Sequence, residues 1–316
     1  MTDVTRVYRS KSTLLGKAGR RVVALDHFSL GIQAGEIYGL VGESGSGKTT
    51  ASRLIVGLEK PDAGHIHLQG DDVVGLSGRA RREFTRKVQV IFQDPYQSLN
   101  AHLSIFDAVC EPLIIHGIGN RAQRLEKVCT ALATAGLKPP ETYLGRYPHQ
   151  LSGGQRQRAA IARAMVLSPL FLIADEPTSM LDATISFQIF QLLNHLRGTF
   201  DVAMLFITHS LAAARNLCDR VGVIYQGRLV EEGTAKETIM HPRHPYTKAL
   251  LDAHPRFGSR SHSAYDTLRA ESRPVPQGAH CRFYPRCRLA IENTCNLKVP
   301  PTKTVQAGHR VACFLF

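Results

Sequence analysis

EIYGLVGESGSGKTTASRLIVGL, residues 36–58, decides the fold. The segment opens with an apolar run of strand length and closes with a helical pattern that includes Leu54, Ile55 and Leu58. Between the two, GESGSGKT at residues 42–49 fits the phosphate-loop pattern G-x-x-x-x-G-K-[ST], in the strand-to-helix context that this motif requires. The stretch therefore predicts an α/β domain that binds a nucleotide.

The loop supplies an anion site through its backbone. Glycines let backbone N–H groups converge on phosphates, and the helix that follows points its positive end at the same anion. We expect Lys48 to reach the β- and γ-phosphates and the hydroxyl of Thr49 to ligate Mg²⁺. The residues predicted to bind ATP here are Gly42, Glu43, Ser44, Gly45, Ser46, Gly47, Lys48, Thr49 and Thr50.

FLIADEP, residues 171–177, predicts the second part of the site. This apolar strand ends in two carboxylates, and a carboxylate at the tip of a buried strand beside a phosphate loop is placed to hold Mg²⁺ through water. We assign that role to Asp175. Side chains alternate along an extended chain, so Glu176 can face the γ-phosphate and polarise an attacking water.

LSGGQRQRAAIARAM, residues 151–165, adds a second anion cradle. Ser152, Gly153 and Gly154 stand at the start of a helix, where backbone amides can bind phosphate. A single nucleotide needs only the cradle of its own phosphate loop. The economical arrangement is a head-to-tail dimer in which the second cradle of each chain closes over the ATP of its partner.

The remaining pattern predicts the architecture around these motifs. Strands and helices alternate between about 155 and 232, and the strands are continuously apolar, which indicates a mostly parallel sheet covered on both faces. The helical spacing from about 100 to 150 predicts an insertion into that sheet. Further strands are expected at 65–70, 88–93, 202–208 and 221–227, and further helices at 155–167 and 183–198.

Together, GESGSGKT, LIADEP and LSGGQ resemble the ATP-binding subunit of an ABC transporter over roughly residues 4–235. The resemblance implies a RecA-like P-loop NTPase fold with a helical subdomain at about 96–158, and an ATPase that works in transport. It also implies roles for single residues. By this resemblance Gln93 contacts Mg²⁺ and water, His209 contacts the γ-phosphate, Tyr8 stacks on adenine, and Gln155 and Asp182 complete the nucleotide contacts.

The chain after about residue 236 narrows the resemblance. By its own chemistry HPRHPYTKALL, residues 241–251, is only a turn followed by a short helix. With the cysteine-rich tail behind it, this stretch resembles the ATPases of dipeptide, oligopeptide and nickel importers. QDPYQSLN at 93–100 is more similar to the second of the two ATPases in such importers. Residues 236–316 are therefore expected to form a separate C-terminal region, joined through a polar linker rich in proline and glycine.

Four of the seven cysteines lie in that tail, at Cys281, Cys287, Cys295 and Cys313. Four thiols in a reducing compartment suggest a metal site rather than disulfides. The gaps are wider than in structural zinc sites and do not match ferredoxin spacings, so spacing alone leaves the metal open, and four free thiols remain an alternative. The resemblance implies a [4Fe–4S] cluster on these residues.

The composition sets the expected partners. The formal net charge is +13, but there is no dense basic tract with interleaved aromatics, so nucleic-acid binding is not expected. No signal segment or membrane span is recognisable, so we expect a soluble or membrane-peripheral protein in the cytosol. The resemblance implies a peripheral subunit at the cytoplasmic face of the inner membrane. The resemblance implies a second ATP-binding subunit, identical or homologous, two membrane permeases and a solute-binding protein. The alternative is an ABC ATPase accessory to a soluble enzyme complex, of the carbon–phosphorus lyase type.

Overall fold

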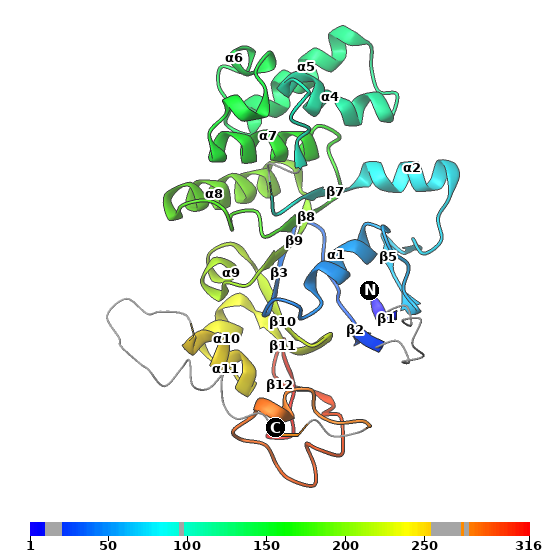
Figure 1. The fold of residues 1–316 in the computed structure, drawn as a ribbon, viewed down its shortest axis with the longest axis vertical. Helices are drawn as coiled ribbons and strands as arrows, with labels where there is room; N and C mark the ends of the chain where they lie inside the picture. The colour runs from blue at the N-terminus through cyan, green and yellow to red at the C-terminus, as the bar shows by residue number, and fades with distance from the viewer. Residues whose placement is uncertain (10–20, 95–97, 254–272, 275–277) are drawn as a thin grey trace, which may run out of the picture. The chain divides into compact units, whose positions relative to one another are not determined.

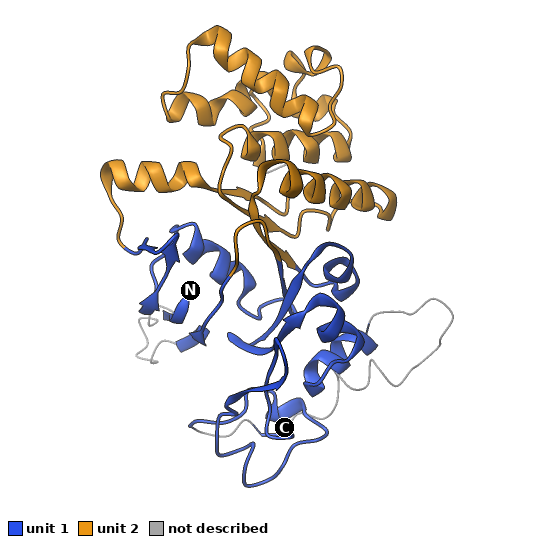
Figure 2. Ribbon diagram, turned by 180° about the vertical axis from the view of Figure 1, so that it is seen from behind, with its two compact units in different colours: residues 1–31, 38–74, 208–316 blue, residues 32–37, 75–207 orange. Residues whose placement is uncertain are grey.

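The computed structural model describes residues 1–9, 21–94, 98–253, 273–274 and 278–316. The chain folds into two compact units, coloured separately in Figure 2. Unit 1 comprises Met1–Gly31, Tyr38–Val74 and Thr208–Phe316, and unit 2 comprises Ile32–Ile37 and Gly75–Ile207. Figure 1 labels the elements within them. The predicted polar linker lies almost entirely outside the described residues.

Unit 1 is built on a five-stranded run of sheet in the order β12-β13-β11-β10-β3. Only β3 and β10 are parallel, whereas the C-terminal strands join antiparallel. The bounds of these strands are β3 Ile37–Val41, β10 Arg220–Tyr225, β11 Arg228–Thr234, β12 Thr302–Gln306 and β13 His309–Ala312. The predicted mostly parallel sheet is therefore correct at β3 and β10 but becomes mixed where the C-terminal hairpin extends it.

Smaller elements complete unit 1. They include an antiparallel sheet of order β2-β1-β4 and a two-stranded β5-β6 pair. The strand expected at 65–70 is wrong as a single element, because β4 ends at His65 and β5 is separate. The bounds are β1 Thr2–Arg9, β2 Arg21–Phe28, β4 Ala63–His65, β5 His67–Leu68, β6 Asp71–Asp72, α1 Lys48–Ile55, α9 Leu211–Leu217, α10 Ala235–Met240, α11 Pro245–Asp252 and η2 Tyr284–Arg286.

Unit 2 contains three parallel strands in the order β9-β8-β7. β8 is buried up to its last residue and β9 throughout, which explains why both read as unbroken apolar runs. The bounds are β7 Val88–Ile91, β8 Phe171–Asp175, β9 Ala203–Thr208, α2 Gly78–Lys87, α4 Ile105–Ile115, α5 Arg121–Thr134, α6 Glu141–Leu144, η1 Pro148–Gln150, α7 Gly153–Met165 and α8 Ala183–Phe200.

The helices of unit 2 begin and end where the side chains can cap them. Ser104 accepts a hydrogen bond from the Asp107 amide at the start of α4, and Asn120 and Gln123 form a capping box on α5. Gly136, with φ of 81°, follows the last turn of α5 in the left-handed conformation that glycine tolerates. The helical stretch that the spacing predicted at about 100–150 is therefore divided into separately capped helices. Among the described helices, none is long and apolar enough to cross a membrane.

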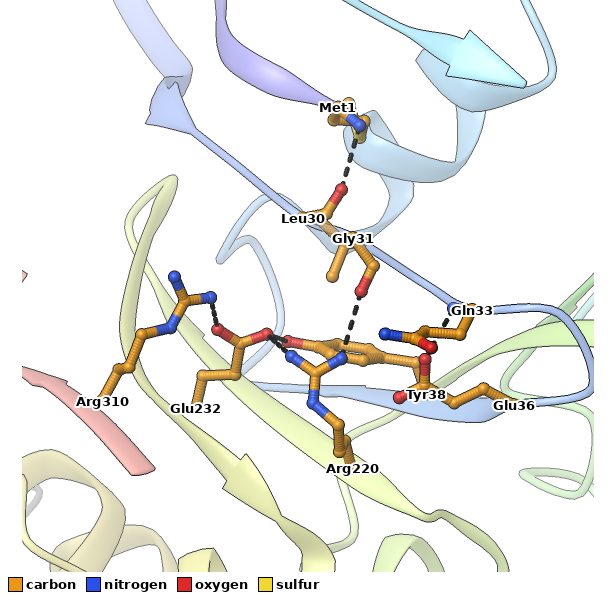
Figure 3. Close-up of polar contacts among 9 residues, drawn as sticks. All are labelled: Met1, Leu30, Gly31, Gln33, Glu36, Tyr38, Arg220, Glu232 and Arg310. Carbon is orange, nitrogen blue, oxygen red and sulfur yellow. Dashed lines mark hydrogen bonds and ion pairs between the residues drawn. The ribbon is translucent and has the colours of Figure 1, made fainter. Parts of the chain in front are cut away.

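A buried polar network ties the C-terminal hairpin to the sheet of unit 1 (Figure 3). Glu232 on β11 is 2% exposed and accepts hydrogen bonds from the Tyr38 hydroxyl at 2.9 Å, from Arg220 at 2.5 Å and from Arg310. A buried carboxylate needs such partners, because an unpaired buried charge costs several kcal/mol. Through Glu232 the network joins β3, β10, β11 and β13, so the tail is part of the folded core of unit 1.

Candidate functional site

The phosphate loop runs between β3 and α1 in unit 1. Its conformation depends on glycine: Gly45 has φ of 77° and Gly47 has φ of 114°. A Cβ on Gly42 would lie 2.4 Å from the carbonyl oxygen of Ile224, so no side chain fits at the first position of the loop. The loop therefore depends on glycine for the close approach at Gly42 and for the left-handed backbone at Gly45 and Gly47.

Lys48 and Ser46 are the polar side chains enclosed by this loop. Lys48 is 6% exposed, and its Nζ donates to the carbonyl oxygens of Gly42 at 2.7 Å and Glu43 at 2.8 Å. In the described structure the buried Oγ of Ser46 has no hydrogen-bond partner. A buried cation and an unsatisfied hydroxyl inside a glycine turn at a helix start fit a bound polyphosphate.

The predicted acidic residues lie in unit 2, where β8 ends. Asp175 closes the strand, and Glu176 follows with φ of 46°, which is rare for a residue with a side chain. The Glu176 amide donates to the Ile207 carbonyl at 2.9 Å, which helps to hold this conformation. Residues held in such sparsely populated backbone regions are common at functional sites.

Gln93 meets Glu176 within the same unit. Its Nε2 donates to Oε2 of Glu176 at 3.3 Å. Gln93 follows β7, which pairs in parallel with β8, so the two side chains emerge from the carboxyl ends of neighbouring strands. The structure thus brings together two of the residues that the sequence assigned to catalysis.

The second anion cradle is a well-capped helix start in unit 2. The Ser152 side chain accepts from the Gln155 amide at 3.2 Å, and the Gln155 side chain accepts from the Ser152 amide at 3.1 Å. Gly153 and Gly154 form the first turn of α7, where amides have no acceptor within the helix. A Cβ on Gly154 would approach Ile185 to 2.8 Å, so the glycine also permits close packing of α7 against α8.

Three further predicted residues occupy distinct places. Asp182 in unit 2 caps α8 by accepting from the Ile185 amide at 2.9 Å. His209 in unit 1 is exposed between β9 and α9. Tyr8 on β1 already has partners, because its hydroxyl donates to Glu59 at 2.6 Å and the Arg6 guanidinium lies 5.0 Å from its ring centroid.

The four cysteines of the tail lie within electrostatic reach of one another in unit 1. The pKa of Cys281 is raised to about 11 by burial and, less strongly, by the charges of Cys295, Cys287 and Cys313. Backbone amides of Phe283, Leu289, Ile291 and Leu315 donate to the sulfurs of Cys281, Cys287, Cys295 and Cys313 respectively. Within the described residues, however, no group of three or more His, Cys, Asp or Glu side chains is arranged to hold a metal ion.

The structure also reveals two residues at the phosphate loop that the sequence did not single out. The Tyr246 hydroxyl accepts from the Glu43 amide at 3.0 Å, and Arg286 forms an ion pair with the Glu43 carboxylate. Both come from the C-terminal region, where HPRHPYTKALL was interpreted only as a turn and a helix. No sequence signal links these positions to residue 43, since more than 200 residues separate each of them from it.

The glycine turn with its enclosed lysine, and the carboxylates that end a parallel strand, define the class: a P-loop ATPase. Comparison with known families refines it. Residues 25–179 match the family described as ABC transporter, and residues 230–295 match the oligopeptide/dipeptide transporter C-terminal region.

Individual relatives agree with both matches. The oligopeptide transport ATP-binding protein AppF of Bacillus subtilis is 38% identical over 100% of this chain and 96% of its own length. The di/tripeptide transport ATP-binding protein DppF of Pseudomonas aeruginosa is 40% identical, over 98% of this chain and 95% of its own. An ATP-binding cassette solved as a post-hydrolysis dimer with ADP and Pi has a TM-score of 0.65 and 30% identity, covering 74% of this chain and 97% of that one. The chain belongs to the ABC transporter ATP-binding proteins that carry the oligopeptide/dipeptide C-terminal region, and it is an ATPase.

Proposed function

We propose that this chain hydrolyses ATP to drive the uptake of dipeptides or oligopeptides through partner permeases in the membrane. The observation that carries the proposal is the extent of the similarity: relatives named for peptide transport align over at least 95% of their own length, with the C-terminal region included. All of them are named as transport proteins, so the alternative of a soluble enzyme complex is not favoured.

The proposed function assigns a role to each domain of the chain. Residues 1–235 form the ATP-binding domain, with the helical subdomain at about 96–158. Residues 236–316 form the C-terminal region. The exposed apolar side chains Ile114 and Ile115 at the end of α4 lie in the helical subdomain, where contact with a permease would cover them. The chain works as a peripheral subunit on the cytoplasmic face of the membrane, with two permeases and a solute-binding protein as partners.

Each predicted site residue has a chemical role in hydrolysis. Lys48 neutralises charge on the β- and γ-phosphates, and the amides of residues 42–50 bind the same oxygens. Thr49, Asp175 and Gln93 would hold Mg²⁺, which supplies charge neutralisation on the phosphates when bound. Glu176 accepts a proton from the attacking water, and Gln93, which donates to the Glu176 carboxylate, orients that base.

A second subunit completes each ATP site in this proposal. The cradle of Ser152, Gly153, Gly154 and Gln155 binds the γ-phosphate of the ATP held by the partner subunit. Asp182 caps the helix that packs beside this cradle, and His209 contacts the γ-phosphate in its own chain. To stack on adenine, Tyr8 would have to break its contacts with Glu59 and Arg6. ATP therefore joins two subunits, and hydrolysis lets them separate.

The four tail cysteines are proposed to hold a [4Fe–4S] cluster. Support comes from the chemistry of the donor set, since four thiols that each accept a backbone amide could serve as the thiolate ligands of such a cluster. Among the described residues these thiols do not form a group arranged to hold a metal ion, so binding of the cluster would have to draw them together. Anaerobic purification should give a brown protein with four irons and four sulfides per chain, as the cluster formula requires. A colourless protein, or one loaded with zinc, would reject the cluster.

Uptake in cells tests the proposed function. A strain that lacks this chain is supplied with the native protein or with Glu176→Gln, and uptake of a radiolabelled tripeptide and of labelled nickel is measured. The native chain should restore peptide uptake and Glu176→Gln should not. Restoration of nickel uptake alone, or purification with soluble enzymes instead of permeases, would contradict peptide import.

A further inference from the structure

Glu43 is the phosphate-loop residue that the C-terminal region contacts. It follows Gly42 directly, so its backbone forms the first turn of the loop. All three of its polar groups are engaged: the amide donates to Tyr246, the carbonyl oxygen accepts from Lys48 at 2.8 Å, and the carboxylate pairs with Arg286. Two of these three partners come from beyond residue 235.

The pair between Arg286 and Glu43 is bidentate. Nη1 of Arg286 lies 2.9 Å from Oε2 and Nη2 lies 3.1 Å from Oε1 of the carboxylate. The two side chains are only 23% and 34% exposed, so water screens the pair less than it would a surface ion pair. A planar fork that matches a carboxylate fixes the orientation of the carboxylate as well as its position.

Aromatic packing fixes the other side of this contact. Phe283, three residues before Arg286, packs against Tyr225 and Tyr246 with ring centroids 5.2 Å and 5.4 Å apart. The Arg286 guanidinium lies 5.8 Å from the Tyr225 ring centroid and donates to the Tyr225 hydroxyl at 3.4 Å. The arginine is thus held by buried neighbours rather than by a flexible surface loop.

The same short segment carries the cysteines. Arg286 is the last residue of the 3₁₀ turn η2 and directly precedes Cys287. The amides of Arg286 and Cys287 donate to the carbonyl oxygens of Phe283 and Tyr284 respectively. The Cys281 amide donates to the Cys295 carbonyl at 2.8 Å, which closes the loop that holds the turn. The conformation of the cysteine segment, residues 281–295, therefore also fixes the position of the Arg286 guanidinium, which pairs with Glu43 of the phosphate loop.

We propose that Arg286 is a positioning residue for the phosphate loop, and that through its pair with Glu43 the cysteine segment sets the affinity for ATP. In ATP binding, Arg286 acts through its pair with the Glu43 carboxylate. With the pair in place the first turn of the loop is held open for phosphate. Without it the turn samples other conformations, and part of the binding energy is spent on ordering it.

Nucleotide binding by the purified full chain tests this role. Arg286→Met keeps the aliphatic stem but removes the fork, and it should raise the Kd for a fluorescent ATP analogue about five- to tenfold. Since the chemical step is untouched, KM for ATP should rise while kcat stays within about twofold. Arg286→Lys should restore part of the lost ATP affinity, because lysine keeps the positive charge but not the two-pronged contact with Glu43. Amides of residues 42–47 should exchange hydrogen faster in Arg286→Met.

The matched control is Arg282→Met, from the same segment. Arg282 pairs with Asp26 on β2 at 2.6 Å and does not contact the loop, so its loss should leave the Kd within about twofold. Glu43→Gln tests the pair from the loop side should Arg286→Met fail to fold. The double variant should bind ATP no more weakly than the weaker single variant.

Several outcomes would overturn the inference. Arg286→Met with native ATP affinity would do so, as would a double variant whose losses multiply, or an Arg282→Met variant that is equally impaired. Because the measurement needs only nucleotide, it is independent of the transported solute. A chain that failed to restore peptide uptake would refute the proposed function and leave this result standing.

Discussion

The phosphate loop offers a matched pair of substitutions whose costs can be worked out from the structure. Gly45 and Gly47 both lie in the left-handed region, with φ of 77° and 114°. A Cβ on Gly45 would meet nothing within 4 Å, whereas on Gly47 it would lie 2.6 Å from the Ala24 carbonyl oxygen. Alanine at either position carries the conformational cost, and only Gly47→Ala adds a clash with backbone.

The two costs differ enough to be separated. Placing a side chain in the left-handed region costs about 1–2 kcal/mol, and overpacking a closed site adds about 1–3 kcal/mol. Gly45→Ala should therefore lower the free energy of unfolding by about 1–2 kcal/mol and Gly47→Ala by about 2–5 kcal/mol. Urea unfolding of the full chain, followed through tyrosine fluorescence, gives both values.

Gly31→Ala is the control, because its φ is not positive and its Cβ would meet nothing within 4 Å. It should be neutral within about 0.5 kcal/mol. The reasoning fails if Gly47→Ala is no more destabilised than Gly45→Ala. In that case the approach of the Ala24 carbonyl does not limit the loop.

Three other predictions concern catalysis and stability. Glu176→Gln keeps the contact with Gln93 but not the base, so ATP turnover should fall about 10²–10⁴-fold while ATP still binds; unchanged turnover would remove Glu176 from catalysis. Burial lowers the pKa of His244 from 6.5 to about 3, so the folded state binds fewer protons than the unfolded state. The neutral His244 therefore costs no stability above pH 6.5, and below pH 6.5 the free energy of unfolding decreases by up to about 1.4 kcal/mol per pH unit. His244→Gln should reduce this pH dependence in urea titrations at pH 5 and pH 7. Gly198 in helix α8 is exposed and a Cβ there would meet nothing within 4 Å, so Gly198→Ala should stabilise the fold by about 0.5–1 kcal/mol in the same assay. A loss of stability would contradict the helical assignment there.

The sequence predicted the elements whose signals are local. The strands β3, β8 and β9 are buried and read as apolar runs, and α7 begins directly after Ser152, where the sequence predicted a helix start. Helix α2 was missed because GRARREFTRK has only one buried residue, Phe84, and so shows no apolar stripe.

The C-terminal hairpin was missed for a different reason. β12 and β13 are short, and β12 is largely exposed, so their place in the sheet depends on pairing with β11 rather than on their own pattern. The partners that anchor β13, Glu231 with His309 and Glu232 with Arg310, are polar pairs that a search for apolar periodicity does not detect.

The candidate site likewise contains residues that the sequence predicted and residues that only the structure revealed. Motif chemistry was sufficient to select the phosphate loop, the carboxylates after β8 and the cradle at Ser152. It could not find the φ of 46° at Glu176, which is a property of the folded backbone. Nor could it find Tyr246 and Arg286, because a contact with Glu43 across more than 200 residues leaves no local pattern.

The central claim is that the working ATPase is a pair of subunits, since the two amide cradles of one chain serve different nucleotides. The most direct test measures ATP turnover per protomer of the purified chain over a wide dilution series, with the mass of the protein in ATP followed by light scattering. The account predicts that turnover per protomer falls toward zero wherever the protein is monomeric. A monomer that hydrolyses ATP at the same full rate at every concentration would contradict it.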